Sequence, residues 1–218
     1  MVRLRRLKMW SWIVISFLVL ATIMIGGCVR ISEGTWYFRE APLPEGWPAL
    51  TPVGEVKVKA YPQYRAAVVR AGDSDQSTMD GQFMTLFKHI QDRDIAMTAP
   101  VEMGFAGRDK EPARQAMTSM AFLYRNPTQG KLEVDAGVQV EDLPARTYAS
   151  IGVRGGYDDA QAARQLKMLD AWLRENAAQW KADGPPRLLG YNSPFVPVFM
   201  RYGEVQVPVR KVEEPAEK

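Results

Sequence analysis

The chain has 218 residues, enough for one domain of ordinary size and an appendage. Its formal net charge is +3, but residues 1–28 hold four basic and no acidic residues, so the remaining body carries 24 basic against 25 acidic residues. This near-neutral body argues against nucleic acid as a partner, because phosphate binding needs a basic face. Cys28 is the only cysteine, which excludes an internal disulfide and a cysteine-rich metal site.

Residues 1–28 have the pattern of an export signal that ends at a lipid-modified cysteine. A basic start, residues 1–8, precedes an apolar run of 17 residues, 9–25. Ile25-Gly26-Gly27-Cys28 follows and resembles the lipobox of bacterial lipoproteins, in which the cysteine is diacylated and everything before it is removed. We therefore predict a signal peptide with lipobox over 1–28 and lipidation of Cys28. The alternative is an uncleaved signal anchor with a chance cysteine. Either way, the basic end stays inside and the body lies on the exported, periplasmic side of the cell envelope.

The next segment, residues 29–53, shows no sustained apolar period and is predicted to be a proline-rich tether between the membrane and the domain. Aromatic residues are unusual in a pure linker, so we expect some of them to pack onto the domain. The prolines are Pro42, Pro44, Pro48 and Pro52, and the aromatic residues are Trp36, Tyr37, Phe38 and Trp47.

The body, residues 54–210, reads as two copies of one unit. Residues 56–70 alternate apolar and polar positions and turn near Pro62, which predicts a hairpin of two strands. Residues 138–154 do the same around Pro144, 82 residues later. A helical pattern follows each pair, over about 78–91 and 159–181, and each helix start carries a capping residue: Ser77 in the first and Asp158 in the second. At an offset of 83, the apolar stripe of the first helix falls on that of the second.

After each helix come a strand marked by proline and a last strand, at residues 119–125 and 204–209. Each half thus reads ββ-α-ββ, and this internal repeat defines the fold class. We predict an α+β domain with an antiparallel, eight-stranded, barrel-like sheet flanked by two long helices, one on either side, and a cleft where the halves meet. Residues 211–218 are a charged tail, predicted to be disordered.

Several stretches in this order resemble the SOUL haem-binding proteins. Residues 95–101, Ile-Ala-Met-Thr-Ala-Pro-Val, resemble that family's central motif. Residues 189–194, Leu-Gly-Tyr-Asn-Ser-Pro, resemble its late turn, and Gly203-Glu204-Val205 resembles its closing strand. The resemblance covers roughly residues 54–209. It implies the duplicated fold shared with small-molecule effector-binding domains, and non-covalent binding of haem or another tetrapyrrole without catalysis.

The candidate ligands of a haem iron are one histidine and several methionines. His89 is the sole histidine and the candidate metal ligand, since histidine commonly holds haem iron. It lies on the flank of the first helix's apolar stripe, where a half-exposed surface residue is the usual outcome. Met97, Met103 and Met200 could offer a thioether, although methionine commonly fills cores.

Other residues could form the walls and rim of a tetrapyrrole site. The apolar wall would come from Tyr191, Phe195, Val196 and Phe199, for which a plain core role is the alternative. Cations could pair with the ligand's carboxylates, and solvated surface charges are the alternative for them. The candidate cations are Arg65, Arg70, Lys88 and Arg201.

No enzymatic site is predicted, and hydrolysis by carboxylates alone is the alternative. Ser193 and Thr98 precede prolines but have no histidine partner predicted nearby, and a single histidine excludes multi-histidine metal sites. The leading function is a membrane-tethered tetrapyrrole-binding domain. The second is a binding module for another apolar small molecule, favoured because the stretches 92–94 and 200–203 depart from the family pattern. The third is an envelope interaction protein whose cleft is packed shut.

Overall fold

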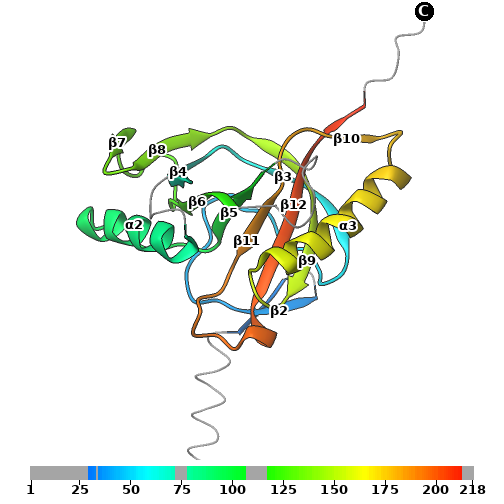
Figure 1. Ribbon diagram of the computed structural model, residues 1–218, viewed down its shortest axis with the longest axis horizontal. Helices are drawn as coiled ribbons and strands as arrows, with labels where there is room; N and C mark the ends of the chain where they lie inside the picture. The colour runs from blue at the N-terminus through cyan, green and yellow to red at the C-terminus, as the bar shows by residue number, and fades with distance from the viewer. Residues whose placement is uncertain (1–28, 33, 72–77, 107–116, 213–218) are drawn as a thin grey trace, which may run out of the picture.

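The computed structural model describes residues 29–32, 34–71, 78–106 and 117–212 (Figure 1). The predicted signal peptide with Cys28, the first helix's predicted cap Ser77 and most of the predicted tail lie outside these ranges. No helix within them has the length and apolar character needed to span a bilayer.

The first half of the body forms the strands and the helix that its pattern predicts. Pro62 lacks a backbone donor and separates two alternating strands. The helix begins after Thr78, whose hydroxyl accepts a hydrogen bond from the Gly81 amide at 3.1 Å and satisfies a first-turn donor. The elements are β3 (Val56–Tyr61), β4 (Tyr64–Arg70), α2 (Met79–Asp92), β5 (Val101–Phe105) and β6 (Met117–Leu123).

The second half repeats this order. Asp158 caps α3 as predicted, accepting from the Gln161 amide at 2.8 Å. The helix ends at Glu175, earlier than the predicted 181, and Asn176 caps it: its side-chain Nδ2 donates to the Trp172 carbonyl at 2.8 Å and its backbone amide donates to the same oxygen at 3.0 Å. The elements are β8 (Val138–Leu143), β9 (Arg146–Arg154), α3 (Asp159–Glu175), β10 (Trp180–Ala182), β11 (Arg187–Gly190), the short helix η3 (Val198–Met200) and β12 (Tyr202–Lys211).

The strands form one antiparallel sheet with the order β3-β9-β12-β11-β5-β6-β4-β8-β7, and β10 pairs with β12. For the eight expected strands, exchanging each strand with its counterpart in the other half gives the same order read in reverse, with β5 and β11 at the centre. Two short strands, β10 and β7 (Glu133–Asp135), add to the eight that were expected. Among the described strands the path is open, from β3 to β7, so the pairings do not show closure into a barrel.

The hairpins expected at Pro62 and Pro144 are not paired as hairpins. β3 crosses to the second half and pairs with β9, while β4 pairs with β6 and β8. The two halves are thereby interlocked, because each contributes an outer strand to the other.

Both helices cover the same face of the sheet, rather than one face each. Leu86 and Ile90 of α2 and Leu166 and Leu169 of α3 belong to one buried apolar cluster with the sheet residues of that face. Alternate residues of the same strands point to the opposite face and form an aromatic cluster. Its buried members are Tyr37, Leu50, Tyr61, Tyr148, Leu189, Tyr191 and Tyr202.

The segment expected to be a tether covers this second face. It contains a small hairpin, β1 (Val29–Ser32) with β2 (Thr35–Phe38), and then runs across the sheet. Tyr37 and Leu50 are buried there, and Trp47 packs on Tyr61 with ring centroids 4.7 Å apart. The expectation that some of these aromatic residues pack onto the domain is confirmed. The tethering role of residues 29–53 stays a prediction.

Candidate functional site

An apolar cavity of about 220 Å³ lies where the two halves of the sheet meet. The start of α2 closes one side of it, and the central strands β5 and β11, paired with each other, close another. Chain segments from both halves and from the N-terminal segment line it. The lining residues are Glu40, Ala41, Met79, Asp80, Phe83, Met97, Thr98, Ala99, Val101, Met103, Met120, Tyr157, Gly190, Tyr191, Asn192, Ser193 and Pro194.

Four methionines give the cavity its chemical character. Met103 and Met120 are buried at its base, Met97 is half-buried, and Met79 is exposed at the helix start. Methionine is unbranched and polarisable, so it adapts to ligands of irregular shape and contacts aromatic rings favourably. Phe83 adds an aromatic wall, which the ring of Phe122 fixes edge-on at 5.0 Å.

Tyr157 fixes the far wall of the cavity. Its ring lies over two strand glycines: a Cβ added at Gly190 would be 3.0 Å from the ring, and one at Gly203 would be 3.1 Å from it. The Tyr157 hydroxyl donates to the Tyr202 carbonyl at 2.8 Å and accepts from the Asn192 amide at 2.9 Å. The phenol of Tyr157 is protonated at neutral pH even at its ordinary pKa of 10.0, and burial raises this pKa further, so both contacts are kept. The small residues of β11 and β12 therefore allow an aromatic side chain to shape the cavity.

The rim of the cavity is acidic. Glu40 accepts hydrogen bonds from the Ser193 amide at 2.8 Å and the Ser193 hydroxyl at 2.6 Å, which fixes the turn after β11. Asp80 is exposed on the opposite side. No lysine, arginine or histidine is among the described lining residues. The cavity thus suits an apolar group and offers no cation to a bound carboxylate.

The structure brings three of the predicted site residues together at this cavity, namely Met97, Met103 and Tyr191. Phe195 and Phe199 do not line it; they are 94% and 74% exposed on the loop beyond Pro194. Val196 is buried beneath that loop, also outside the cavity.

His89 lies elsewhere and is not half-exposed as expected. Its side chain is only 4% exposed, and its Nε2 is 3.1 Å from the Tyr124 hydroxyl. Burial, with a contribution from the Arg93 charge, lowers the pKa of His89. The β7–β8 hairpin lies beside this flank of α2, and Arg93 of the helix end pairs with Glu133 of β7 at 2.5 Å and with Asp135 at 2.7 Å. The result is a separate polar cavity of about 260 Å³ between α2 and β8.

None of the four predicted cations lines the apolar cavity. Arg65 pairs with Asp142 at 2.8 Å and Arg70 with Glu141 at 2.6 Å, both across neighbouring strands. Arg201 donates to backbone carbonyls of its own loop. Lys88 lies at the polar cavity beside His89.

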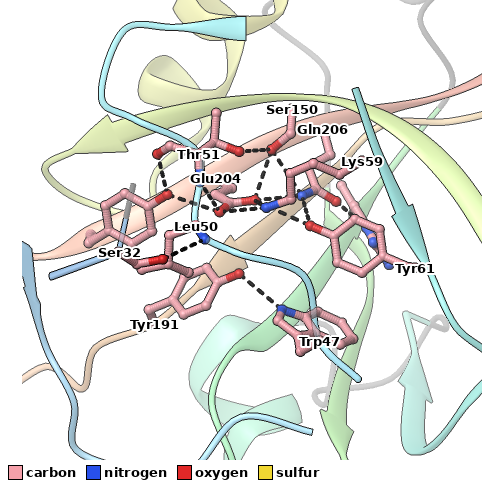
Figure 2. A network of polar contacts seen from close by, with 12 residues as sticks. Ser32, Trp47, Leu50, Thr51, Lys59, Tyr61, Ser150, Tyr191, Glu204 and Gln206 are labelled. Carbon is pink, nitrogen blue, oxygen red and sulfur yellow. Dashed lines mark hydrogen bonds and ion pairs between the residues drawn. The ribbon is translucent and has the colours of Figure 1, made fainter. Parts of the chain in front are cut away.

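Sequence reasoning missed a buried polar network on the aromatic face of the sheet (Figure 2). Glu204 is fully buried and pairs with Lys59 at 2.7 Å. It also accepts from the Thr51 amide at 2.9 Å, the Ser150 hydroxyl at 2.8 Å and Gln206 Nε2 at 2.7 Å. Burial alone would raise the pKa of Glu204, but Lys59 and these hydrogen bonds outweigh it and hold this pKa below its usual range.

A second buried charge, Arg187, continues the network. It donates to Glu102 at 2.9 Å and to Gln206 at 2.9 Å, and its guanidinium lies 3.7 Å from the centroid of the Tyr148 ring. The only signal in the sequence is the alternation of the strands, which would equally fit polar residues facing water. Trp47 connects the N-terminal segment that covers this network to the cavity, since its indole nitrogen donates to the hydroxyl of the lining residue Tyr191 at 3.1 Å (Figure 2).

Comparison with solved structures finds the same architecture in bacterial proteins. EcmrR in its complex with DNA superposes with a TM-score of 0.59 at 15% identity, over 72% of this chain and 58% of that chain. Two Listeria innocua proteins, one uncharacterized and one described as a hydrolase, give TM-scores of 0.54 and 0.51 at 12% and 13% identity. Both alignments cover 73% of this chain and 94% of the other. Such low identities show the fold alone, and this chain spans a little over half the length of the EcmrR chain.

The family is shown by the sequence. No protein with a curated description matches the chain. The model of the SOUL heme-binding protein family matches residues 49–208, which include strands β3 to β11, helices α2 and α3, and all the lining residues of the cavity except Glu40 and Ala41. The match also starts ahead of β3, at the residues that cover Glu204. The chain therefore belongs to the SOUL heme-binding protein family.

Proposed function

We propose that this protein is a membrane-tethered, non-catalytic domain that binds haem or a related tetrapyrrole in the cavity between its halves. The observation that carries the proposal is the methionine-lined apolar cavity at the centre of a SOUL-family fold. We also infer that the cavity arises from duplication of one ββ-α-ββ unit, supported by the symmetric strand order.

The cavity fits part of a tetrapyrrole. Burying apolar surface contributes roughly 25 cal/mol per Å², so walls of methionine and aromatic rings supply affinity without an iron–ligand bond. Met97 and Met103 would hold the macrocycle, and methionine thioethers are known haem ligands. The volume, about 220 Å³, is below the roughly 300–1,000 Å³ of sites that enclose a whole ligand. The carboxylates of the macrocycle would therefore lie in solvent, away from the acidic rim at Glu40.

The non-catalytic part of the proposal rests on what the hydroxyl groups near the cavity contact. Thr98 donates to the Leu123 carbonyl, and Ser193 donates to Glu40. The sole histidine, His89, lines the other cavity and contacts the Tyr124 hydroxyl. Among the described residues, no serine or threonine hydroxyl pairs with a histidine base.

The tethering part rests on residues 1–28. Their basic start, apolar run and Ile25-Gly26-Gly27-Cys28 support a lipid anchor and a location in the cell envelope with the domain on the exported side.

Titration of the full chain with haem, followed in the Soret band, tests the ligand. Each measurement uses a detergent blank, because haem partitions into micelles. We expect a saturable shift at micromolar concentrations. Met97→Asp should weaken binding by about tenfold or more, because an unpaired carboxylate would face the macrocycle. Met97→Leu keeps the wall apolar, so any loss of affinity in this variant measures the contribution of the thioether.

Phe195→Asp is the matched control, since Phe195 is exposed outside the cavity and its replacement should leave the titration unchanged. A titration with no saturable shift would rule out haem. Equal losses in Met97→Asp and Phe195→Asp would show binding outside this cavity.

The second candidate is a site for a smaller apolar molecule. The observation that favours it is the limited volume together with the absence of histidine and of cations from the described lining. A fluorescent apolar probe would then bind the wild-type chain, and Met97→Asp would weaken its binding, even if haem does not bind. No response to either compound would favour an interaction protein with a closed cleft.

A further inference from the structure

An apolar surface stands out at one end of the molecule. Phe195, Val198 and Phe199 are 94%, 51% and 74% exposed on the loop between β11 and β12, and Trp36 of the neighbouring β2 is 39% exposed. We call these four residues the aromatic end. Scattered exposed apolar residues are normal, whereas a group of them on one loop and its neighbour marks an interaction site.

Hydrogen bonds fix the conformation of this loop, so its side chains are exposed by a defined backbone structure. Arg201 donates to the Val196 carbonyl at 2.8 Å and to the Pro194 carbonyl at 2.7 Å, which fixes the loop from within. Val196 is buried under the loop while its neighbour Phe195 faces outward. The fold therefore presents Phe195 to the surroundings on a rigid support.

The aromatic end lies beside the point where the N-terminal segment joins the described chain. Arg154 connects β2 to η3, because it donates to the Met200 carbonyl at 2.9 Å and to the Trp36 carbonyl, and its guanidinium stacks 3.7 Å from the Trp36 ring. Val29, the first described residue, is opposite Phe38 in the β1–β2 register. Figure 1 shows β2 and η3 (orange-red) together at the lower end of the molecule, with β7 at the upper left.

We propose that the aromatic end rests on the lipid bilayer to which residues 1–28 attach the chain, with the rings of Phe195, Phe199 and Trp36 in the interfacial layer. This inference rests on the proposed membrane tether. Whether the anchor is lipidated Cys28 or an uncleaved apolar run over residues 9–25, it ends at most a few residues before β1, so an attached chain has little length to hold this end away from the lipid. Aromatic rings are favoured at the membrane interface, and Arg154 beside Trp36 can meet lipid phosphates.

The arrangement would also bring the cavity close to the membrane. Pro194 lines the cavity and directly precedes Phe195. An apolar ligand dissolved in the bilayer would then reach the cavity without crossing water.

The test uses the full chain with Cys28→Ser, which leaves the apolar run in place and removes the only thiol. A single cysteine replaces Phe195, Phe199 or, as the matched control, Val134, which is 78% exposed on β7 away from the aromatic end. Each variant carries an environment-sensitive fluorophore and is reconstituted into phosphatidylcholine–phosphatidylglycerol vesicles. Unchanged circular dichroism confirms that the variants fold, which is expected because all three positions are exposed.

We expect fluorophores at 195 and 199 to shift their emission to shorter wavelength, to be quenched by nitroxide-labelled lipid and to lose most of their quenching by aqueous iodide. The fluorophore at 134 should keep its iodide quenching. Vesicle flotation separates the two proposals. A variant that floats but leaves 195 and 199 as open to iodide as 134 overturns this inference alone. Flotation of the wild-type chain, which keeps Cys28, tests the tether, and a wild-type chain that does not float overturns the tether together with this inference. Protection at 195 and 199 that vanishes on dilution in lipid would mean contact between copies and would also overturn it.

Discussion

Removing the ammonium group of Lys59 tests whether the Glu204 network is a buried ion pair that supports the fold. In Lys59→Met the side chain keeps its apolar stem, but Glu204 loses its only described cationic partner, 2.7 Å away. Glu204 has no exposed surface, so its charge cannot turn to solvent. It would keep the hydrogen bonds from the Thr51 amide, the Ser150 hydroxyl and Gln206 Nε2, which offset part of the loss.

The expected loss follows from this geometry. Breaking a fully buried pair from one side costs about 3–5 kcal/mol in the free energy of unfolding, since the remaining charge is uncompensated. For a domain of this size that corresponds to a fall in Tm of about 6–20 °C. The pKa of Glu204 should rise in the variant, above its unfolded value. Its protonation then favours the folded state at low pH, so the deficit should shrink as the pH falls.

Urea unfolding of the full chain, followed by near-ultraviolet circular dichroism, measures the effect. The double variant Lys59→Met with Glu204→Gln removes both charges. Its loss in the free energy of unfolding should be smaller than the sum of the two single-variant losses by about 0.5–3 kcal/mol. Arg70→Met is the surface control, since the Arg70–Glu141 pair is 2.6 Å long but the Arg70 side chain is 53% exposed. It should cost only about 0.2–1 kcal/mol. The reasoning is refuted if Lys59→Met costs no more than this control, or if the double variant shows no coupling.

Three further predictions concern other parts of the chain. The pKa of His89 is lowered in the folded state, so the unfolded state binds more protons below its ordinary pKa of 6.5, and stability should fall as the pH drops below that value. His89→Gln should remove this part of the pH dependence, measured as Tm between neutral and mildly acidic pH; an unchanged slope would mean that other groups cause it. Gly152→Ala should destabilise by about 1–3 kcal/mol in thermal unfolding, because its Cβ would lie 2.2 Å from the Thr51 carbonyl oxygen and push away the segment that covers Glu204; a neutral result would show that this segment packs loosely. Cys28→Ser should abolish incorporation of radiolabelled palmitate and processing at residue 28, and a wild-type chain that carries no label and still begins at Met1 would contradict the lipoprotein prediction.

Sequence patterns predicted most of the secondary structure and indicated the family. The alternation around Pro62 and Pro144 predicts β3, β4, β8 and β9, and the apolar stripes predict α2 and α3, because a residue's spacing along one element decides which face it shares. The cap at Asp158 is equally local, since a carboxylate reaches amides only three residues away. Met97, Met103 and Tyr191 could be placed near one another because their motifs occupy equivalent positions in the repeat.

The tertiary structure decided everything that depends on which segments pair across the halves. Local patterns cannot show that β3 joins β9, and only that pairing brings Lys59 to Glu204 and makes a buried ion pair of residues that a strand could equally expose. His89 is buried where a hairpin distant in sequence lies beside its helix. By itself the sequence determined the two helices, the eight main strands and the family, since these depend on short-range spacing and composition. The site's walls, its lack of a histidine and the exposed Phe195 depend on long-range packing, which only the folded chain displays.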